Sequence, residues 1–301
     1  MGSLVVLGVF VADTSFRASR MPKMGETLLG DSFALGPGGK GSNQAVAAGK
    51  LGADVSIISC LGDDDFGKMA LQTWQGANVR PVIIQKKDAY TGAAFIFVDA
   101  KSGDNAIIVC PGAAAEINPS IIAENHTLIA SADVFMTQLE QPIETAYAGL
   151  KLAKEHGNIT ILNPAPAAEL PEDIFALCDY LTPNETEAEV ITGRPVRTEK
   201  EAEFAAEALV KKGVKTPIIT MGKQGAYLYG YGMVPAINAG PVVETTGAGD
   251  AFNGALATAL AEGKSPLVAV RFGCATAALS VTRAGTAPAM PSREEVERLL
   301  G

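Results

Sequence analysis

The sequence predicts an α/β fold in three layers, with helices on both faces of a central, mainly parallel sheet. Short segments rich in β-branched residues alternate along the chain with amphipathic segments, which is typical of a parallel sheet covered by helices. Strands are expected at 55–59, 134–136, 159–162 and 217–221, and helices at 42–50, 143–155 and 201–212. A closed eight-stranded barrel alternates in the same way at this length. A hairpin-like region near residue 100 and two consecutive helices, 250–262 and 267–282, favour the open sheet.

The composition is that of one globular domain that binds small molecules. The 301 residues are 48% hydrophobic, so the chain is able to bury a large core, and no repeat or linker divides residues 1–301. The net charge is −9 and lysine and arginine form no cluster, which argues against nucleic acid as a partner. Four cysteines lie far apart, at Cys60, Cys110, Cys178 and Cys274. This spacing suggests neither a disulfide framework nor a thiolate metal site, and it fits a reducing cytoplasm.

The first expected strand covers residues 4–11, an apolar run close to the N-terminus. This run is far too short to span a bilayer, and it lacks a cationic leader and a cleavage site. We therefore expect a cytoplasmic protein without a membrane anchor.

Two regions, about 14–33 and 91–110, interrupt the alternation of strand and helix. Strand-like pieces at 93–98 and 106–109 follow one another with no helix between them. Together the two regions predict a small antiparallel β flap, or lid, attached to the main sheet.

Glycine-rich segments precede two of the expected helices. The late one, Gly247-Ala-Gly249, opens the helix that contains Asp250. The first turn of a helix has unpaired N–H groups and a partial positive charge, so this segment is a candidate anion site. A bound anion would repel Asp250, which indicates that this carboxylate has another purpose; in isolation it could be a helix N-cap. In the early segment, 36–44, glycines let the backbone approach a ligand, and Lys40 and Asn43 offer donors to hydroxyl oxygens.

Two other glycine patterns only superficially suggest phosphate sites. Residues 62–69 have the G-x-x-x-x-G-K spacing of a P-loop, but they contain three consecutive carboxylates, and Met69 lacks the hydroxyl that would hold magnesium. Residues 247–252 are not a dinucleotide fingerprint, because Phe252 replaces the third glycine. We expect an ordinary strand-to-helix loop at 62–69.

Four longer motifs carry a resemblance to a known family. They are GGKGSNQAVAAG, TTGAGDAFNGAL, LNPAP and TPNETEAE, and the whole chain resembles the ribokinase family of sugar kinases, the PfkB-type carbohydrate kinases. The resemblance implies a ribokinase-like fold and transfer of the γ-phosphoryl of ATP to the 5-hydroxyl of a pentose, D-ribose first. It also implies Mg²⁺, activation by K⁺ and a homodimer formed through the lid. The alternative is a 2-deoxyribose kinase or another sugar or nucleoside kinase of this fold; the intact Asp250 and glycines argue against a non-catalytic sugar sensor.

The resemblance also assigns roles to individual residues. Asp250 corresponds to the catalytic base, and the amides of Gly247, Ala248 and Gly249 correspond to an anion hole for the migrating phosphoryl group. Sugar-contacting positions fall on Val11, Asp13, Gly38, Gly39, Lys40, Asn43, Glu140 and Asp250. ATP-contacting positions fall on Asn184, Thr220, Gly222, Gly225, Gly249 and Cys274. Monovalent-cation positions fall on Glu244, Thr246, Ser280, Arg283 and Gly285.

One further element and three departures complete this interpretation. Asn184 and Glu187 match an N-x-x-E element that organises magnesium and phosphate, with Glu187 acting on the metal indirectly; alone, the pair is also a helix-capping pattern. Val11 stands where members that phosphorylate ribose usually carry asparagine. A sugar hydroxyl facing valine would lack its partner, at a cost of about 1–3 kcal/mol, which leaves room for 2-deoxyribose or another sugar without a polar group at that point. Glu244 replaces the usual aspartate of the cation site, and Cys274 replaces a histidine that often flanks adenine.

Overall fold

The computed structural model describes residues 2–301 and contains a large and a small β-sheet. The large sheet has nine strands in the order β13-β12-β11-β10-β9-β8-β1-β4-β5. These strands are β1 (Ser3–Leu7), β4 (Asp54–Gly62), β5 (Val79–Lys86), β8 (Val134–Thr137), β9 (Ile159–Leu162), β10 (Tyr180–Leu181), β11 (Thr216–Thr220), β12 (Gly225–Leu228) and β13 (Gly232–Pro235). All neighbours from β11 to β5 are parallel, and β12 and β13 are antiparallel to theirs. The predicted open, mainly parallel sheet is confirmed.

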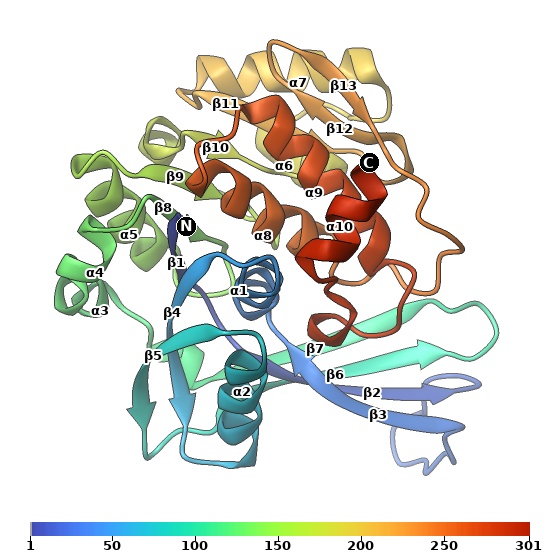
Figure 1. The fold of residues 1–301 in the computed structure, drawn as a ribbon. Coiled ribbons are helices and arrows are strands. Elements are labelled where there is room, and N and C mark those ends of the chain that lie inside the picture. Colours follow the sequence, from blue (N-terminus) through green and yellow to red (C-terminus); the bar gives the residue numbers. More distant parts are fainter. Residues whose placement is uncertain (1) are drawn as a thin grey trace.

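Helices cover both faces of the large sheet (Figure 1). The α-helices are α1 (Lys40–Lys50), α2 (Asp65–Gly76), α3 (Pro119–Glu124), α4 (His126–Ala130), α5 (Ile143–Glu155), α6 (Glu185–Thr192), α7 (Glu199–Lys211), α8 (Ala248–Ala261), α9 (Pro266–Ser280) and α10 (Arg293–Leu300). Alternate side chains of a strand point to opposite faces. Accordingly, Leu4 and Val6 of β1 belong to the core that includes α1 and α8, whereas Val5 and Leu7 belong to the core that includes α5. Across residues 2–301, none of the helices combines the length and apolar character needed to cross a membrane.

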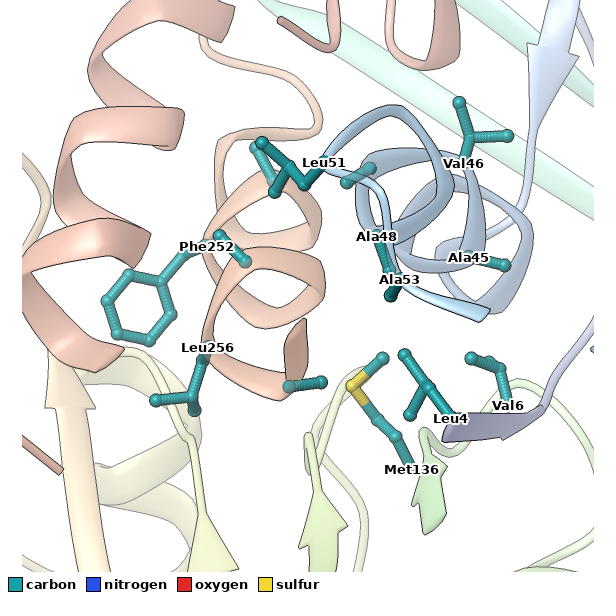
Figure 2. Close-up of a cluster of buried hydrophobic side chains, with 14 of the residues drawn as sticks. Leu4, Val6, Ala45, Val46, Ala48, Leu51, Ala53, Met136, Phe252 and Leu256 are labelled. Carbon is teal, nitrogen blue, oxygen red and sulfur yellow. The ribbon is translucent and has the colours of Figure 1, made fainter. Parts of the chain in front are cut away.

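The α1–α8 contact is built from small residues. Figure 2 shows Ala45 and Ala48 of α1 above Leu4 of the sheet, with α8 beside them. A Cβ atom added to Gly254 of α8 would lie 2.5 Å from the carbonyl oxygen of Gln44 in α1. Because a larger side chain would separate the helices, glycine at this position keeps the two glycine-rich motifs next to each other.

The expected strand at 4–11 is wrong in its second half, because β1 ends at Leu7 and the next strand begins only at Val11. Gly8 lies directly against the start of α1, where an added Cβ would be 2.5 Å from the Cα atom of Gly41. The chain therefore leaves the large sheet under the N-terminus of α1 and enters the small sheet.

The small sheet projects from the main body at its lower edge in Figure 1. Its strands are β2 (Val11–Ala18), β3 (Ser32–Gly38), β6 (Thr91–Asp99) and β7 (Asn105–Gly112), in the order β3-β2-β6-β7. The β2–β3 and β6–β7 pairs are antiparallel, as expected, while the central β2–β6 pair is parallel. The two hairpins come from distant parts of the chain, so the sequence of neither hairpin predicts that β2 and β6 pair in parallel.

Candidate active site

A cavity of about 150 Å³ lies at the carboxyl ends of the parallel strands, where ligands of open α/β sheets bind. Asn163, Thr182 and Thr220 mark the ends of β9, β10 and β11 in its wall. The complete lining is Lys40, Asn163, Ala165, Thr182, Asn184, Glu187, Thr220, Gly247, Gly249, Asp250 and Asn253. The cavity thus combines residues predicted for the sugar, the nucleotide and the phosphoryl group.

The N-terminus of α8 opens into this cavity. Gly247 is the N-cap residue and has a φ of 81°, a left-handed conformation that favours glycine. No side chain among residues 2–301 caps this helix. Gly247 and Gly249 both line the cavity, and a Cβ atom on Gly249 would meet nothing within 4 Å. The helix start can therefore receive an anion, as its sequence predicts.

Asp250 lies in the first turn of α8 rather than at its N-cap, so the simple capping alternative does not describe it. Its side chain is only 7% exposed. Asn43 donates from Nδ2 to its Oδ2 at 3.0 Å, and Gln44 donates from Nε2 to its Oδ1 at 3.1 Å. Burial raises the pKa of Asp250, while Lys40 and the two amide donors act against this rise. The carboxylate is thus largely buried, is held by two amide donors and lines the cavity.

Other acidic side chains around Lys40 have raised pKa values. Burial raises the pKa of Glu140 to about 7, with the Lys40 charge and a hydrogen bond from the Lys40 amide, 2.7 Å from Oε2, opposing the rise. Burial also raises the pKa of Glu187, and the charge of Asp250 adds to the increase. Such concentration of buried acids around one lysine is typical of functional sites.

Asp13 adds another carboxylate from the small sheet. Burial, and then the charges of Asp250 and Glu244, raise its pKa to about 6. It lies against Gly38, where an added Cβ would be 2.2 Å from Oδ2 of Asp13. Val11 is buried on the same face of β2, two residues earlier. Gly39 has a φ of 89° and an added Cβ would be 2.5 Å from the Val9 carbonyl oxygen, so this turn requires glycine.

The residues predicted for the nucleotide lie partly inside and partly outside the cavity lining. Asn184 and Thr220 belong to the lining, and an isolated parallel bridge pairs them. Gly222 lies in the turn after β11 and Gly225 begins β12, with φ angles of 49° and 110°. Cys274 is buried within α9 in the main core, and burial raises the pKa of its thiol to about 11.

The N-x-x-E element does form the capping box that its spacing also predicts. Asn184 Oδ1 accepts from the Glu187 amide at 2.8 Å, and Glu187 Oε2 accepts from the Asn184 amide at 2.9 Å. Because both residues also line the cavity, capping and ligand binding are compatible here. The hydrogen bonds fix the position of the carboxylate at the cavity wall.

Segments predicted to bind a monovalent cation meet next to the start of α8. Oε2 of Glu244 accepts from the Gly285 amide at 2.8 Å, and the Glu244 amide donates to the Val281 carbonyl oxygen at 3.2 Å. The Arg283 amide donates to the Ser280 carbonyl oxygen at 3.2 Å, while its guanidinium pairs with Glu295. Thr246 is exposed at the same turn.

Several polar residues of the site carried no role in the sequence interpretation. They are Gln44, Gln138, Asn163, Thr182 and Asn253, and all are buried. Gln44 and Asn163 belong to the GGKGSNQAVAAG and LNPAP motifs, so the sequence contained a signal for both residues. Thr182 and Asn253 likewise belong to TPNETEAE and TTGAGDAFNGAL. Gln138 lies in none of the four motifs, and only the folded chain places it next to Gln44.

Comparisons with known proteins agree with this geometry. The pattern of the family described as pfkB family carbohydrate kinase matches residues 1–293. A ribokinase of Haemophilus influenzae is 40% identical over 301 residues, covering 99% of this chain and 98% of that protein. A deoxyribokinase of Salmonella typhi is 36% identical over 302 residues, covering 99% and 98%. The structure of Arabidopsis thaliana ribokinase complexed with ribose and ATP is similar with a TM-score of 0.95 at 32% identity, covering 100% of this chain and 99% of that one.

Proposed function

Because the chain belongs to the pfkB family of carbohydrate kinases, we propose that it transfers the γ-phosphoryl group of ATP to the 5-hydroxyl of D-ribose. It is an ATP-dependent sugar kinase, as are its full-length relatives. One observation carries the assignment of the site: Asp250 and the open N-terminus of α8 line the same cavity. A base and an anion-binding helix start must be adjacent when an alcohol attacks a phosphate.

The reaction follows from these two groups. Asp250 accepts the proton of the sugar hydroxyl, and the alcohol oxygen forms a bond to the γ-phosphorus. The bond between the γ-phosphorus and the bridging oxygen breaks, and ADP leaves with the electron pair. The amides of Gly247, Ala248 and Gly249, with the dipole of α8, stabilise negative charge on the phosphoryl oxygens. The sugar lies beside the N-terminus of α8. Its hydroxyl groups are oriented by Asp13, Lys40, Asn43 and Glu140, and it packs against Val11, Gly38 and Gly39.

Metal ions accompany the nucleotide in this proposal. Asn184 and Glu187 suit Mg²⁺ held indirectly, because the carboxylate of Glu187 supplies oxygen atoms at the cavity wall. Burial raises the pKa of this carboxylate, and the charge of Asp250 adds to the rise. Mg²⁺ would neutralise phosphate charge there. K⁺ suits the meeting point of Glu244 with the segments around Thr246, Ser280, Arg283 and Gly285, where a half-buried carboxylate stands among turns rich in carbonyl groups. Thr220, Gly222, Gly225 and Cys274 form the ATP side.

A cytoplasmic location belongs to the same proposal. ATP is the phosphoryl donor, and all four cysteines in the chain are free thiols, three of them buried. Free thiols persist in a reducing compartment.

A kinase assay on about a dozen sugars and nucleosides, with and without K⁺, tests the proposed activity. D-ribose should be phosphorylated when ATP and Mg²⁺ are present, and K⁺ should raise the rate. 2-Deoxyribose is the second candidate, because Val11 offers no hydrogen bond and a deoxyribokinase is among the relatives. Failure to turn over any sugar or nucleoside would refute the proposal.

Val11→Asn should raise the preference for D-ribose over 2-deoxyribose about tenfold to a hundredfold, because asparagine restores a polar partner for a sugar hydroxyl. The measurement is the ratio of kcat/KM for the two sugars. Val11→Ile, which stays apolar, is the control. A preference ratio that is the same in both variants would contradict this role for Val11.

The homodimer is proposed from the outer face of the small sheet. Phe16 pairs with Phe33 across β2 and β3, with ring centroids 5.0 Å apart, and also contacts Phe95 of β6 at 5.6 Å. Ile108 of β7 is paired with Phe95 and is 60% exposed. This apolar stripe lies on the face opposite to Asp13. A second copy of the sheet would bury it.

Sedimentation analysis should find a dimer, and Ile108→Asp should dissociate it because a carboxylate would be buried in the interface. Val268→Asp is the matched control, since Val268 is an exposed apolar residue of α9 outside the small sheet. A monomeric wild-type protein, or a dimer that Val268→Asp disrupts equally, would overturn this arrangement.

A further inference from the structure

Buried amides form a chain of hydrogen bonds that ends on the carboxylate of Asp250. Asn163 donates from Nδ2 to the backbone carbonyl oxygen of Thr182 at 3.0 Å. Asn163 Oδ1 then accepts from Gln44 Nε2 at 3.1 Å, and the same nitrogen donates to Asp250 Oδ1 at 3.1 Å. Gln44 Oε1 accepts from Gln138 Nε2 at 2.6 Å. Gln44 and Gln138 are completely buried, so these bonds have no water to replace them.

In each of these hydrogen bonds, the chemistry of the groups determines which one donates and which one accepts. A backbone carbonyl oxygen only accepts, so Asn163 must turn its NH₂ group to Thr182 and its oxygen to Gln44. Gln44 must therefore turn its NH₂ group to Asn163, and its second hydrogen reaches Asp250. A flipped Gln44 amide would place its oxygen against two other acceptors, Asn163 Oδ1 and Asp250 Oδ1, and its NH₂ group against the NH₂ group of Gln138.

This direction matters for the carboxylate. With Asn43 on Oδ2 and Gln44 on Oδ1, each oxygen of Asp250 accepts one hydrogen bond from an amide. Hydrogen bonds to the charged form favour that form, and they hold the plane of the carboxylate. Asn43 belongs to the predicted sugar contacts, whereas Gln44 is outside the cavity lining and has all three of its hydrogen-bonding partners within the protein.

We propose that Gln44 is a positioning residue, which orients Asp250 and keeps it unprotonated for catalysis through the amide chain from Thr182. The inference rests on the proposed base role of Asp250, and it assigns to Gln44 no contact with sugar or nucleotide. A positioning residue should affect the rate of the chemical step and its pH dependence more than substrate binding.

Gln44→Met tests this directly, because methionine keeps the length of the side chain but cannot donate to Asp250. We expect kcat with D-ribose to fall about 10- to 100-fold, while KM for ATP changes less than about threefold. The acidic limb of the kcat–pH profile should move to higher pH, by about 1 on the pH scale, since the charged form of the base has lost a donor. The charged groups that face Asp250 from other elements stay in the variant, so the movement reports the lost donor; they are Lys40, Asp13, Glu140 and Glu187. Gln138→Met should move it in the same direction by less, because Gln44 itself remains.

Gln141→Met is the matched control for loss of a buried amide. Gln141 is 3% exposed and donates to Thr137 Oγ1 and the Gln138 carbonyl oxygen, without contacting Asp250. It should lower the thermal stability without moving the pH profile. A Gln44→Met enzyme with an unmoved acidic limb would overturn the positioning role, even if its kcat or stability falls. Should Gln44→Met fail to fold, Gln138→Met decides on the same criterion. A wild-type protein without kinase activity would instead refute the proposed function, before any variant is compared.

Discussion

Asp250→Asn should lower kcat with D-ribose about 10²–10⁴-fold while the protein stays folded and still binds ATP. An amide cannot accept the proton of the attacking alcohol, so the variant loses the base but keeps the shape of the side chain. Stability should change little. The new side chain has only one oxygen, so either Asn43 or Gln44 loses its acceptor, which destabilises the protein. The variant also removes a buried negative charge close to Asp13 and Glu140, which acts in the opposite direction.

The measurements are steady-state turnover, calorimetric titration with ATP and thermal unfolding. Asp179→Asn is the matched control, because Asp179 is equally exposed at 7% but pairs with Lys154 at 2.8 Å, outside the cavity lining. It should lower stability and leave kcat unchanged. Turnover by Asp250→Asn within about threefold of wild type would remove Asp250 from the base role.

Glu140→Gln should raise the free energy of unfolding of the ligand-free protein by about 2–3 kcal/mol more at pH 8 than at pH 5. The pKa of Glu140 is raised from 4.5 to about 7. Between these two values the folded state holds a proton that the unfolded state has released, so the wild-type free energy of unfolding falls as the pH rises from 5 to 7. A pKa difference of one between the folded and unfolded states corresponds to about 1.4 kcal/mol of that free energy.

Urea unfolding of both proteins at several pH values from 5 to 8 measures this difference. The pKa of Asp13 is raised to about 6, so Asp13 also lowers the free energy of unfolding as the pH rises. This contribution is the same in wild type and in Glu140→Gln. Glu294→Gln, at an exposed position of α10, shows the effect of removing a carboxylate from the surface. Parallel curves for wild type and Glu140→Gln would show that Glu140 ionises in the folded protein as it does in the unfolded chain.

Much of the layered fold could be predicted from short stretches of sequence. The segment 217–221 became β11 at Thr216–Thr220, and 267–282 became α9 at Pro266–Ser280. The run at 4–11 was interpreted wrongly, because hydrophobicity does not show that Gly8 must pass against Gly41. The parallel pairing of β2 with β6 was equally hidden, since β3, α1, β4, α2 and β5 lie between the two strands along the chain.

The candidate site divides in the same way. The glycines at 247 and 249 and the acid at 250 could be identified from the sequence, because a turn that opens a helix is a local pattern. The contact of Asn43 with Asp250 joins residues 207 positions apart. The hydrogen bonds from Thr182 through Asn163 to Gln44, the neighbour of Asn43 in α1, add two further segments. No local pattern records such contacts.

The sequence by itself therefore determined the order of strands and helices, the glycine turns and the residue types that can perform phosphoryl transfer. Backbone hydrogen bonding and side-chain periodicity act over a few residues, so these features are readable locally. Only the tertiary structure decided which acids surround Lys40, how the amides around Asp250 are oriented, and how far the pKa values of Asp13 and Glu140 rise. Those properties depend on burial and on neighbours in space, which the packing of α1 against α8 and of the small sheet against the large one brings together.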